Sequence, residues 1–267
     1  MSKRTLDLKP NEGEMLKPKE LMDLKRTGPL TLQDRRVFNG LVQHAWGPNL
    51  GRPSHWFEIS TADLRDATIK SSRLSDSIER LMSTIVLVVE GEGEDAVEHR
   101  TALLSSNSLT MTSNSGILRY KFTEELAKLL KDSTIFAKLD LEVMKSFSSK
   151  YAFSLYEAIA RRIRLQHVFT EEFDLDGMRD LLGVDTGKLQ GYGNLNKIAI
   201  QPAVTEVNAI APYEVTILPK KQGKKVVGFV MGWNMKDEGQ MKAAYKEMLS
   251  HSSGRKARTK NQVIDTI

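Results

Sequence analysis

An α+β fold of two similar units joined by a helix is the fold class that the sequence predicts, from two observations. The first is the order of elements in residues 173–233, where two helical segments precede two strands with a lysine-rich turn between them. The second is a repeat of that order from Phe57 onward. Helix, helix and hairpin in succession is the order of a winged helix-turn-helix, and 267 residues suffice for two such domains. We therefore predict tandem winged helix-turn-helix domains.

The two predicted domains lie between a polar N-terminal segment and a basic C-terminal tail. Residues 1–28 lack hydrophobic periodicity and contain several glycines and prolines, so we expect a flexible arm. The predicted divisions are 1–28 flexible N-terminal arm, 29–133 first winged-helix domain, 134–166 linker and joint helix, 167–236 second winged-helix domain, and 237–267 C-terminal helix and basic tail.

The composition argues against several classes of protein. The chain has no cysteine, which removes disulfides, thiolate metal sites and thiol nucleophiles and favours a reducing compartment. Its longest apolar run, Ile85–Val89, is far too short to cross a membrane, and residues 1–19 lack the apolar segment of a signal peptide. We therefore expect a cytoplasmic protein without a membrane partner.

The charged residues are segregated along the chain. The net charge is only +5, but cations cluster on separate elements while acidic residues gather at 90–95. Such segregation favours a polyanionic partner, and double-stranded DNA is the candidate. A solvated surface explains any one cluster equally well, so the inference depends on their coincidence with the helix-turn-helix pattern. The basic clusters are Arg161, Arg162 and Arg164; Lys220, Lys221, Lys224 and Lys225; and Arg255, Lys256, Arg258 and Lys260.

The first domain is predicted to begin with a capped helix. Thr31 and Asp34 have the spacing of a capping box, and apolar residues at helical spacing follow from Val37 to Ala45. After a Gly/Pro-rich break and a short strand from Phe57, a first candidate recognition helix spans residues 72–82. The residues that we expect to contact DNA here are Lys70, Ser71, Ser72, Arg73, Ser77 and Arg80.

Strands complete the first domain. Residues 84–89 are rich in β-branched side chains and can pair with 97–104 across the acidic loop 90–95, which we interpret as a wing. An acidic wing suits a phosphate backbone badly, so we expect it to point away from DNA or to contact a protein. Further elements are predicted as strands at 109–112 and 117–122 and as a helix at 124–131 capped by Thr123.

A helix at residues 150–166 is predicted to join the domains. Its apolar residues recur at helical spacing, and Arg161, Arg162 and Arg164 lie in its last turns. Cations at this end complement the helix dipole. Alternatively, they contact the DNA backbone beside the second domain. The sequence leaves both interpretations open.

The second domain opens with a helix that we expect Asp176 to cap and Gly183 to stop. In the next helix, 195–210, the polar residues fall on one arc of roughly 80°, which suits base edges in a major groove. A core helix with a narrow solvated face explains the pattern equally well. Pro202 lies early enough in this helix to cause only a local kink. The residues that we expect to contact DNA are Asn194, Asn196, Lys197, Gln201, Thr205 and Asn208.

A hairpin follows this helix, with alternating apolar residues in strands 214–218 and 226–233. Lysines at a hairpin tip also improve solubility, so the pattern alone does not decide between that role and phosphate contact. The turn residues that we expect to touch phosphate are Lys220, Lys221, Lys224 and Lys225.

No catalytic or cofactor-binding pattern stands out. The five histidines are never one or four residues apart, so no paired-ligand motif for a metal exists. Asp174, Asp176 and Asp180 could suggest a divalent cation, but their place around a helix start makes capping the better explanation. The Gly191–Gly193 segment lacks the Gly-Lys-Ser signature of a phosphate-binding loop. We predict a protein that is not an enzyme and binds neither a metal nor a cofactor.

Five features of the chain form a recognisable combination: the run Ser149–Glu157, the run Phe173–Gly183, Tyr192, the run Gln201–Asn208 and the basic hairpin. Together they resemble the motifs of the iteron-binding plasmid replication initiators, the Rep proteins with two winged-helix domains. The resemblance is clearest over residues 136–233, whereas residues 30–130 share mainly the order of elements. One difference is that the start of the second recognition helix offers a single cation, Lys197, where the family is richer in lysine and arginine.

The resemblance implies a function as well as a fold. A monomer would bind directly repeated sites, or iterons, at a plasmid origin in a bacterial cytoplasm, assist origin melting, and recruit host replication initiation proteins and the replicative helicase. A homodimer in equilibrium with it would bind an inverted repeat at its own promoter and act as an autorepressor. Two alternatives remain: a winged-helix transcriptional repressor without a replication role, and an adaptor that uses winged helices for protein contacts.

Overall fold

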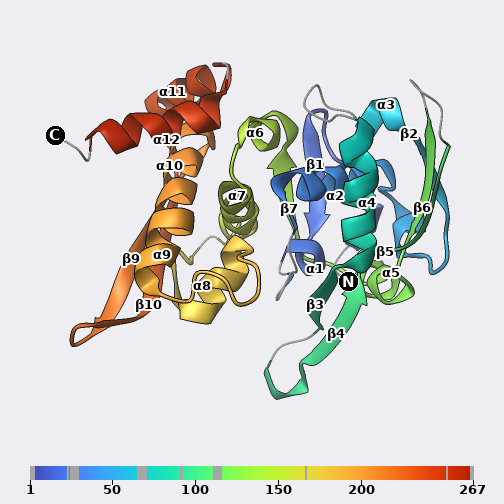
Figure 1. Cartoon of the computed structure of the whole chain (residues 1–267), viewed down its shortest axis with the longest axis horizontal. Helices are drawn as coiled ribbons and strands as arrows, with labels where there is room; N and C mark the ends of the chain where they lie inside the picture. Colours follow the sequence, from blue (N-terminus) through green and yellow to red (C-terminus); the bar gives the residue numbers. More distant parts are fainter. Residues whose placement is uncertain are drawn as a thin grey trace. The chain divides into compact units, whose positions relative to one another are not determined.

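The computed structural model describes residues 4–22, 24, 30–64, 71–90, 93–110, 116–165, 167–250 and 252–264, and within them all side chains except those of 71–73 and 259–264. The chain forms two compact units (Figure 1). The first comprises Met1–Pro10 and Pro18–Phe136, and the second Asn11–Lys17 and Ala137–Ile267. The predicted joint helix therefore belongs to the second unit.

Residues 4–22 are folded, which corrects the prediction of a flexible arm over 1–28 for this part of it. It forms η1 (Thr5–Asp7), β1 (Glu14–Pro18) and α1 (Lys19–Met22), and β1 pairs with β7 (Phe136–Asp140). The buried apolar residues of this segment are distributed over three short elements, so they show no single periodicity in the sequence. The buried residues of the segment include Leu6, Met15, Leu16 and Leu21.

The first helix of the first unit forms as predicted. α2 (Leu32–His44) starts at a capping box in which Asp34 N donates to Thr31 Oγ1 at 3.2 Å and Thr31 N donates to Asp34 Oδ2 at 2.7 Å. Its apolar side, including Val37 and Leu41, is buried in the unit's core. The remaining helices of this unit are η2 (Pro48–Gly51), α3 (Thr61–Leu64), α4 (Ser71–Ser83), η3 (Gly93–Asp95) and α5 (Glu124–Lys131).

The main sheet of the first unit has the strand order of a winged helix. It contains β2 (Phe57–Ser60), β6 (Ile117–Phe122) and β5 (Leu104–Leu109) in the antiparallel order β2-β6-β5. The wing is therefore the connection between β5 and β6. The predicted strand 117–122 is confirmed, whereas 109–112 shares only its start with β5, and residues 111–115 lie outside the described residues.

The acidic loop at 90–95 is consequently not the wing, which corrects that prediction. It joins β3 (Ile85–Glu90) to β4 (Val97–Ala102), which form a separate two-stranded sheet inserted after α4. The predicted strand 97–104 ends early because Leu103 is buried and its N–H donates to Leu81 O in α4 at 3.2 Å. This hydrogen bond turns the chain from one sheet into the other.

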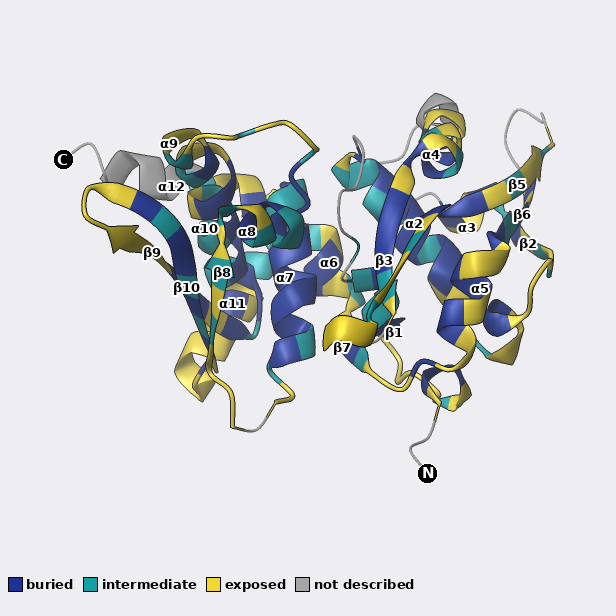
Figure 2. Ribbon diagram, turned by 90° about the horizontal axis from the view of Figure 1, so that it is seen from below, coloured by how far each residue is buried: buried dark blue, intermediate teal, exposed yellow. Residues whose placement is uncertain are grey.

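The second unit repeats the winged-helix arrangement around a sheet in the order β8-β10-β9. Its helix α7 is buried along nearly all of its length, and the buried face of β10 packs over the core (Figure 2). The elements are α6 (Leu141–Ser146), α7 (Lys150–Arg162), β8 (Thr170–Asp174), α8 (Leu175–Leu182), α9 (Tyr192–Leu195), η4 (Asn196–Ile200), α10 (Gln201–Ile210), β9 (Tyr213–Gln222), β10 (Lys225–Met235), α11 (Glu238–Met248) and α12 (Ser253–Ile264).

The caps of α8 are partly as predicted. Gly183 ends the helix in the left-handed region at φ 63°, where glycine is favoured. The N-cap is Asp174, not Asp176, since Asp174 Oδ1 accepts a hydrogen bond from Gly177 N at 2.6 Å. Asp176 lies inside the first turn and pairs with Arg179 at 2.7 Å. Each aspartate lies three residues before a backbone N–H group from which its side chain could accept a hydrogen bond, so the sequence does not distinguish the two possible N-caps.

Candidate nucleic-acid interface

The predicted recognition helix of the second unit is one continuous helix interrupted by a π-helical turn. This turn, η4, ends at Ile200, two residues before Pro202, and Gln201 N donates to Asn196 O, five residues back. Proline lacks an N–H and its ring crowds the carbonyl four residues earlier. The wider turn accommodates both effects, so Pro202 does not break the helix.

The first half of this helix is exposed and the second half is covered. Asn194, Lys197, Ile198 and Gln201 are all exposed. Thr205 is half-buried, as is Asn196. Residues near the N-terminus of a recognition helix make the base contacts in helix-turn-helix proteins. The exposed half is therefore the part that suits a major groove.

Asn208 holds the unit together, which corrects its prediction as a DNA contact. Its Nδ2 donates to Val215 O at 2.9 Å, and its Oδ1 accepts from Val215 N at 2.8 Å. Both halves of the amide are thus used to attach β9 to α10. Next to it, Lys236 Nζ donates to the carbonyls of Asn208 and Ala211 at the end of α10, and burial lowers the pKa of Lys236.

Helices α11 and α12 cover the second half of α10. Between the three helices lies a cleft of about 550 Å³, to which Gln201 and Thr205 contribute. Glu206, fully buried on α10, accepts hydrogen bonds from Ser148 N at 2.8 Å and Ser148 Oγ at 3.0 Å, and pairs with Arg258 of α12. The C-terminal helices are therefore an integral part of the second unit, and Thr205 faces this cleft.

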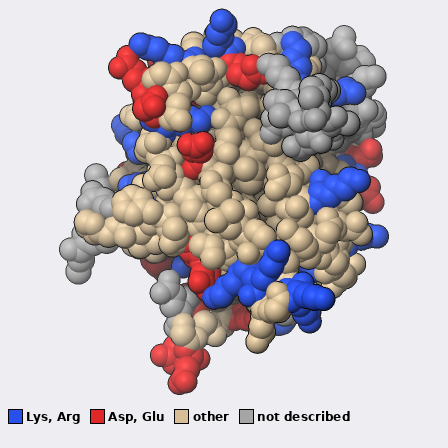
Figure 3. Space-filling view, turned by 90° about the vertical axis from the view of Figure 1, so that its left-hand side faces the viewer, with Lys and Arg blue, Asp and Glu red and all other residues tan. Residues whose placement is uncertain are grey.

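The lysine-bearing hairpin extends from the sheet of the same unit, in which Phe229 of β10 packs against Tyr192 at the start of α9 with ring centroids 6.1 Å apart. Lys220, Lys221, Lys224 and Lys225 are exposed at the ends of β9 and β10, where Gly223 turns the chain at φ 61°. Lys220 pairs with Glu172 of β8, but both side chains are more than half exposed, so water weakens this pair. Figure 3 shows this side of the protein with a largely uncharged middle, around which lysine and arginine lie together with aspartate and glutamate.

In the first unit, two predicted contacts have structural roles instead. Ser77 is fully buried and cannot reach DNA. Arg80 donates through Nε and Nη2 to Asp34 at 2.8 and 2.9 Å, joining α4 to α2. Burial alone would raise the pKa of Asp34, but hydrogen bonds from Arg80 and Thr31 outweigh it and hold that pKa below its usual value.

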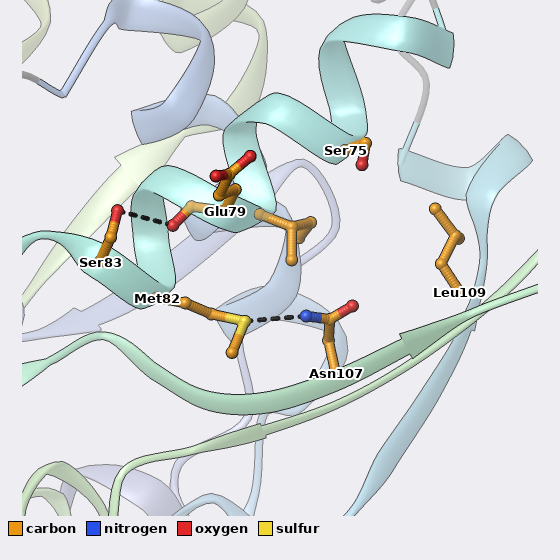
Figure 4. A pocket seen from close by; sticks show the side chains of 7 residues that line it. Ser75, Glu79, Met82, Ser83, Asn107 and Leu109 are labelled. Atoms are coloured by element: carbon orange, nitrogen blue, oxygen red, sulfur yellow. Dashed lines mark hydrogen bonds between the residues drawn. The ribbon is translucent and has the colours of Figure 1, made fainter.

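The other predicted residues of α4 keep their status as predictions. Ser71, Ser72 and Arg73 form the first turn of α4, and Lys70 lies outside the described residues. The side of α4 that faces β5 bears a groove of about 300 Å³ containing Glu79, Met82 and Asn107 (Figure 4). Asn107 Nδ2 donates to Met82 Sδ there at 2.8 Å. Since its lining carries a carboxylate and no cation, this groove does not suit phosphate.

The three arginines near the end of the joint helix have different environments in the structure. Arg162 is buried, pairs with Glu171 through two hydrogen bonds of 2.6 and 3.0 Å, and lies over the Phe173 ring. This pairing corrects its prediction as a DNA contact. Arg161 is half-buried and Arg164 exposed, and both stay candidates.

Sequence reasoning misses one exposed residue of this interface. Ile198 is absent from the residues predicted to contact DNA, because those are polar, yet 48% of its surface is exposed. A usable signal is present, because it lies four residues after Asn194 and three before Gln201, which places all three on one face.

Neither a membrane span nor a metal site is found in the part of the chain that the structure describes. Within it, no helix is long and apolar enough to cross a membrane. Among the same residues, no group of three or more histidine, aspartate and glutamate side chains is arranged to hold a metal ion.

Comparisons with solved structures find the same architecture. The chain is similar to the Pi initiator protein in complex with iteron DNA, at 16% sequence identity and a TM-score of 0.55, covering 85% of this chain and 98% of that one. At this identity the likeness supports the fold of two winged-helix domains. Domains 2 and 3 of RctB match at 13% identity and a TM-score of 0.41, covering 86% and 95%, which is too weak to support an argument. No curated protein matches the chain.

Family models match most of the chain. The WH1 domain of the initiator replication proteins matches residues 15–160, and the WH2 domain of the initiator Rep proteins matches residues 174–233. The two units described above carry the helices and the strand order that these two winged-helix domains require. The chain therefore belongs to the family of initiator Rep proteins.

Proposed function

We propose that this protein initiates plasmid replication by binding directly repeated origin sites as a monomer. The observation that carries the proposal is that the second unit combines an exposed half-helix, with Asn194, Lys197 and Gln201 on one face, and a hairpin that bears four exposed lysines. Side-chain amides read base edges, whereas lysines neutralise phosphates without reading sequence. The two together supply what specific binding to duplex DNA requires.

Membership of the initiator family and the fold likeness support the choice of iterons as the DNA. The Pi initiator was solved with iteron DNA, and the similarity extends over nearly its whole length. We extend that binding mode to this chain, with α4 of the first unit and α9–α10 of the second each entering a major groove. The arginines near the end of α7 would then contact the backbone beside the second unit.

The later steps are part of the same proposal. After binding, the protein would assist origin melting and recruit host replication initiation proteins and the replicative helicase, without catalysing a reaction itself. A homodimer would repress the protein's own promoter. Strand β3, which pairs only with β4 among the described strands, would offer its other edge for this dimerisation, whereas β6 is paired on both sides in its sheet.

Footprinting on DNA that flanks the encoding gene tests this function. Protection of several direct repeats, spaced in phase with the helical turn, is the expected result. Protection of a single inverted repeat would instead identify a repressor without a replication role. Absence of DNA affinity even at low salt would favour an adaptor and refute the proposal.

A further inference from the structure

Ile198 lies exposed at the centre of the face that we propose reads DNA. Nearly half of its surface (48%) is exposed, while its neighbours Ala199 and Ile200 are buried. Asn194 and Gln201 lie on the same face, one helical turn before and after it. An exposed isoleucine contributes little to the core, and its β-branched side chain is a mediocre helix former. Packing in the second unit therefore does not account for it.

The backbone at Ile198 adds a second observation. The residue lies inside the π-helical turn Asn196–Ile200, and such turns occur frequently at functional sites. The turn presents Lys197 and Ile198 side by side on the exposed surface, while Ala199 and Ile200 stay in the core. It thus adds an apolar side chain to a helix face that is otherwise polar.

An isoleucine between two amides fits the chemistry of A·T base pairs. In the major groove, the C5-methyl group of thymine is the apolar feature, and adenine presents the N7 and N6 groups that asparagine and glutamine recognise. We infer that Ile198 packs against the C5-methyl group of a thymine and makes the second unit select thymine at that position. The inference rests on the proposed function, because it requires α9–α10 to enter a major groove.

The test removes the C5-methyl group of a thymine and keeps the base pair. A duplex that the full-length protein binds is obtained by footprinting or by selection from random-sequence duplexes, and each thymine is then replaced in turn by deoxyuridine, which lacks the C5-methyl group. Removal of one buried methyl group should weaken binding about fourfold at one position. Ile198→Ala should bind the thymine and deoxyuridine duplexes equally, and Ile198→Val should restore part of the difference.

Leu249→Ala removes another exposed aliphatic side chain, 67% exposed at the C-cap of α11, and is the control. It should keep the wild-type response to deoxyuridine. The inference is overturned if no deoxyuridine weakens wild-type binding, or if Ile198→Ala keeps the full fourfold response. If the wild-type protein selects no sequence at all, both this inference and the proposed function fail. A selected site without a methyl-sensitive thymine overturns only the inference.

Discussion

Arg258 Nε lies 2.7 Å from Glu206 Oε1, and this ion pair fastens the last helix, α12, to the helix that we propose reads DNA. The Glu206 side chain is fully buried and the Arg258 side chain is 34% exposed. Gly254 of α12 permits this helix to approach Glu206 closely, because a Cβ at Gly254 would lie 2.7 Å from Glu206 Oε2 and 3.0 Å from Ser148 N. The position of α10 therefore depends on the C-terminal helix.

Arg258→Ala should destabilise the second unit. It leaves a buried carboxylate without its cation, and removing the partner of a buried polar group typically costs about 1–3 kcal/mol in the free energy of unfolding, and more for a charged group. Denaturant unfolding followed by circular dichroism measures the change. Lys256→Ala, on the exposed side of the same helix, is the control and should leave stability unaltered. Equal midpoints for wild type and Arg258→Ala would mean that α12 does not hold α10.

The stability of the protein should fall in acid because Asp34 becomes protonated. Its pKa is lowered from 3.8, so the folded state favours the ionised carboxylate, and the gain is fully present above that value. As the pH falls below about 4, protonation removes the gain progressively down to the folded-state pKa. Unfolding curves between pH 2 and pH 7 should therefore show a steeper acid loss for wild type than for Asp34→Asn. Parallel curves for the two proteins would contradict this assignment.

The hairpin lysines should govern the salt dependence of DNA binding. Replacing Lys221 and Lys224 by alanine should flatten the plot of log affinity against log salt concentration by about 0.9 for each phosphate that is no longer neutralised, on any DNA sequence. Lys242→Ala with Lys246→Ala changes the charge equally on α11 and should leave the slope as in wild type. If the slope is the same in all three proteins, the hairpin lysines serve solubility.

Gln201→Ala should reduce specificity rather than general affinity. A side-chain amide that pairs with a base contributes about 1–3 kcal/mol on the cognate site and almost nothing on random DNA. Titrations of both duplexes at one salt concentration measure the two effects. Lys225→Ala is the comparison, since removing a cation that binds phosphate weakens both complexes alike. The same pattern for Gln201→Ala would exclude base reading by this residue.

Much of the architecture can be predicted because local chemistry marks it. The capping box at Thr31, the glycine stop at Gly183 and the alternation in 226–233 each depend on neighbours in sequence. The sequence pattern misidentifies the inserted hairpin β3–β4 as the wing, because strand order in a sheet is a long-range property. Pairing of β5 with β6 depends on residues that follow this insertion in the chain.

The site is harder to predict than the fold, because the exposure of a side chain also depends on residues far away in the sequence. Helical periodicity places Ser77 and Asn208 among polar residues, but it does not reveal that one is enclosed by the core and the other bonds to β9. Ile198 is the converse case, since this apolar residue lies outside the predicted polar arc although its side chain is exposed. A polar arc specifies which residues share a face, and only the packed neighbours decide whether that face meets water.

Strand β1 has a consequence for the order in which the protein folds during its synthesis. The strand ends at Pro18, and its partner β7 begins only at Phe136. Lys17 also forms a buried ion pair of 2.7 Å with Glu157, a residue that is synthesised later still. Nearly the whole first unit is therefore synthesised before residues 11–17 can form their contacts in the second unit. A nascent chain stalled before residue 136 should expose this segment to protease, and release of the full-length chain should protect it.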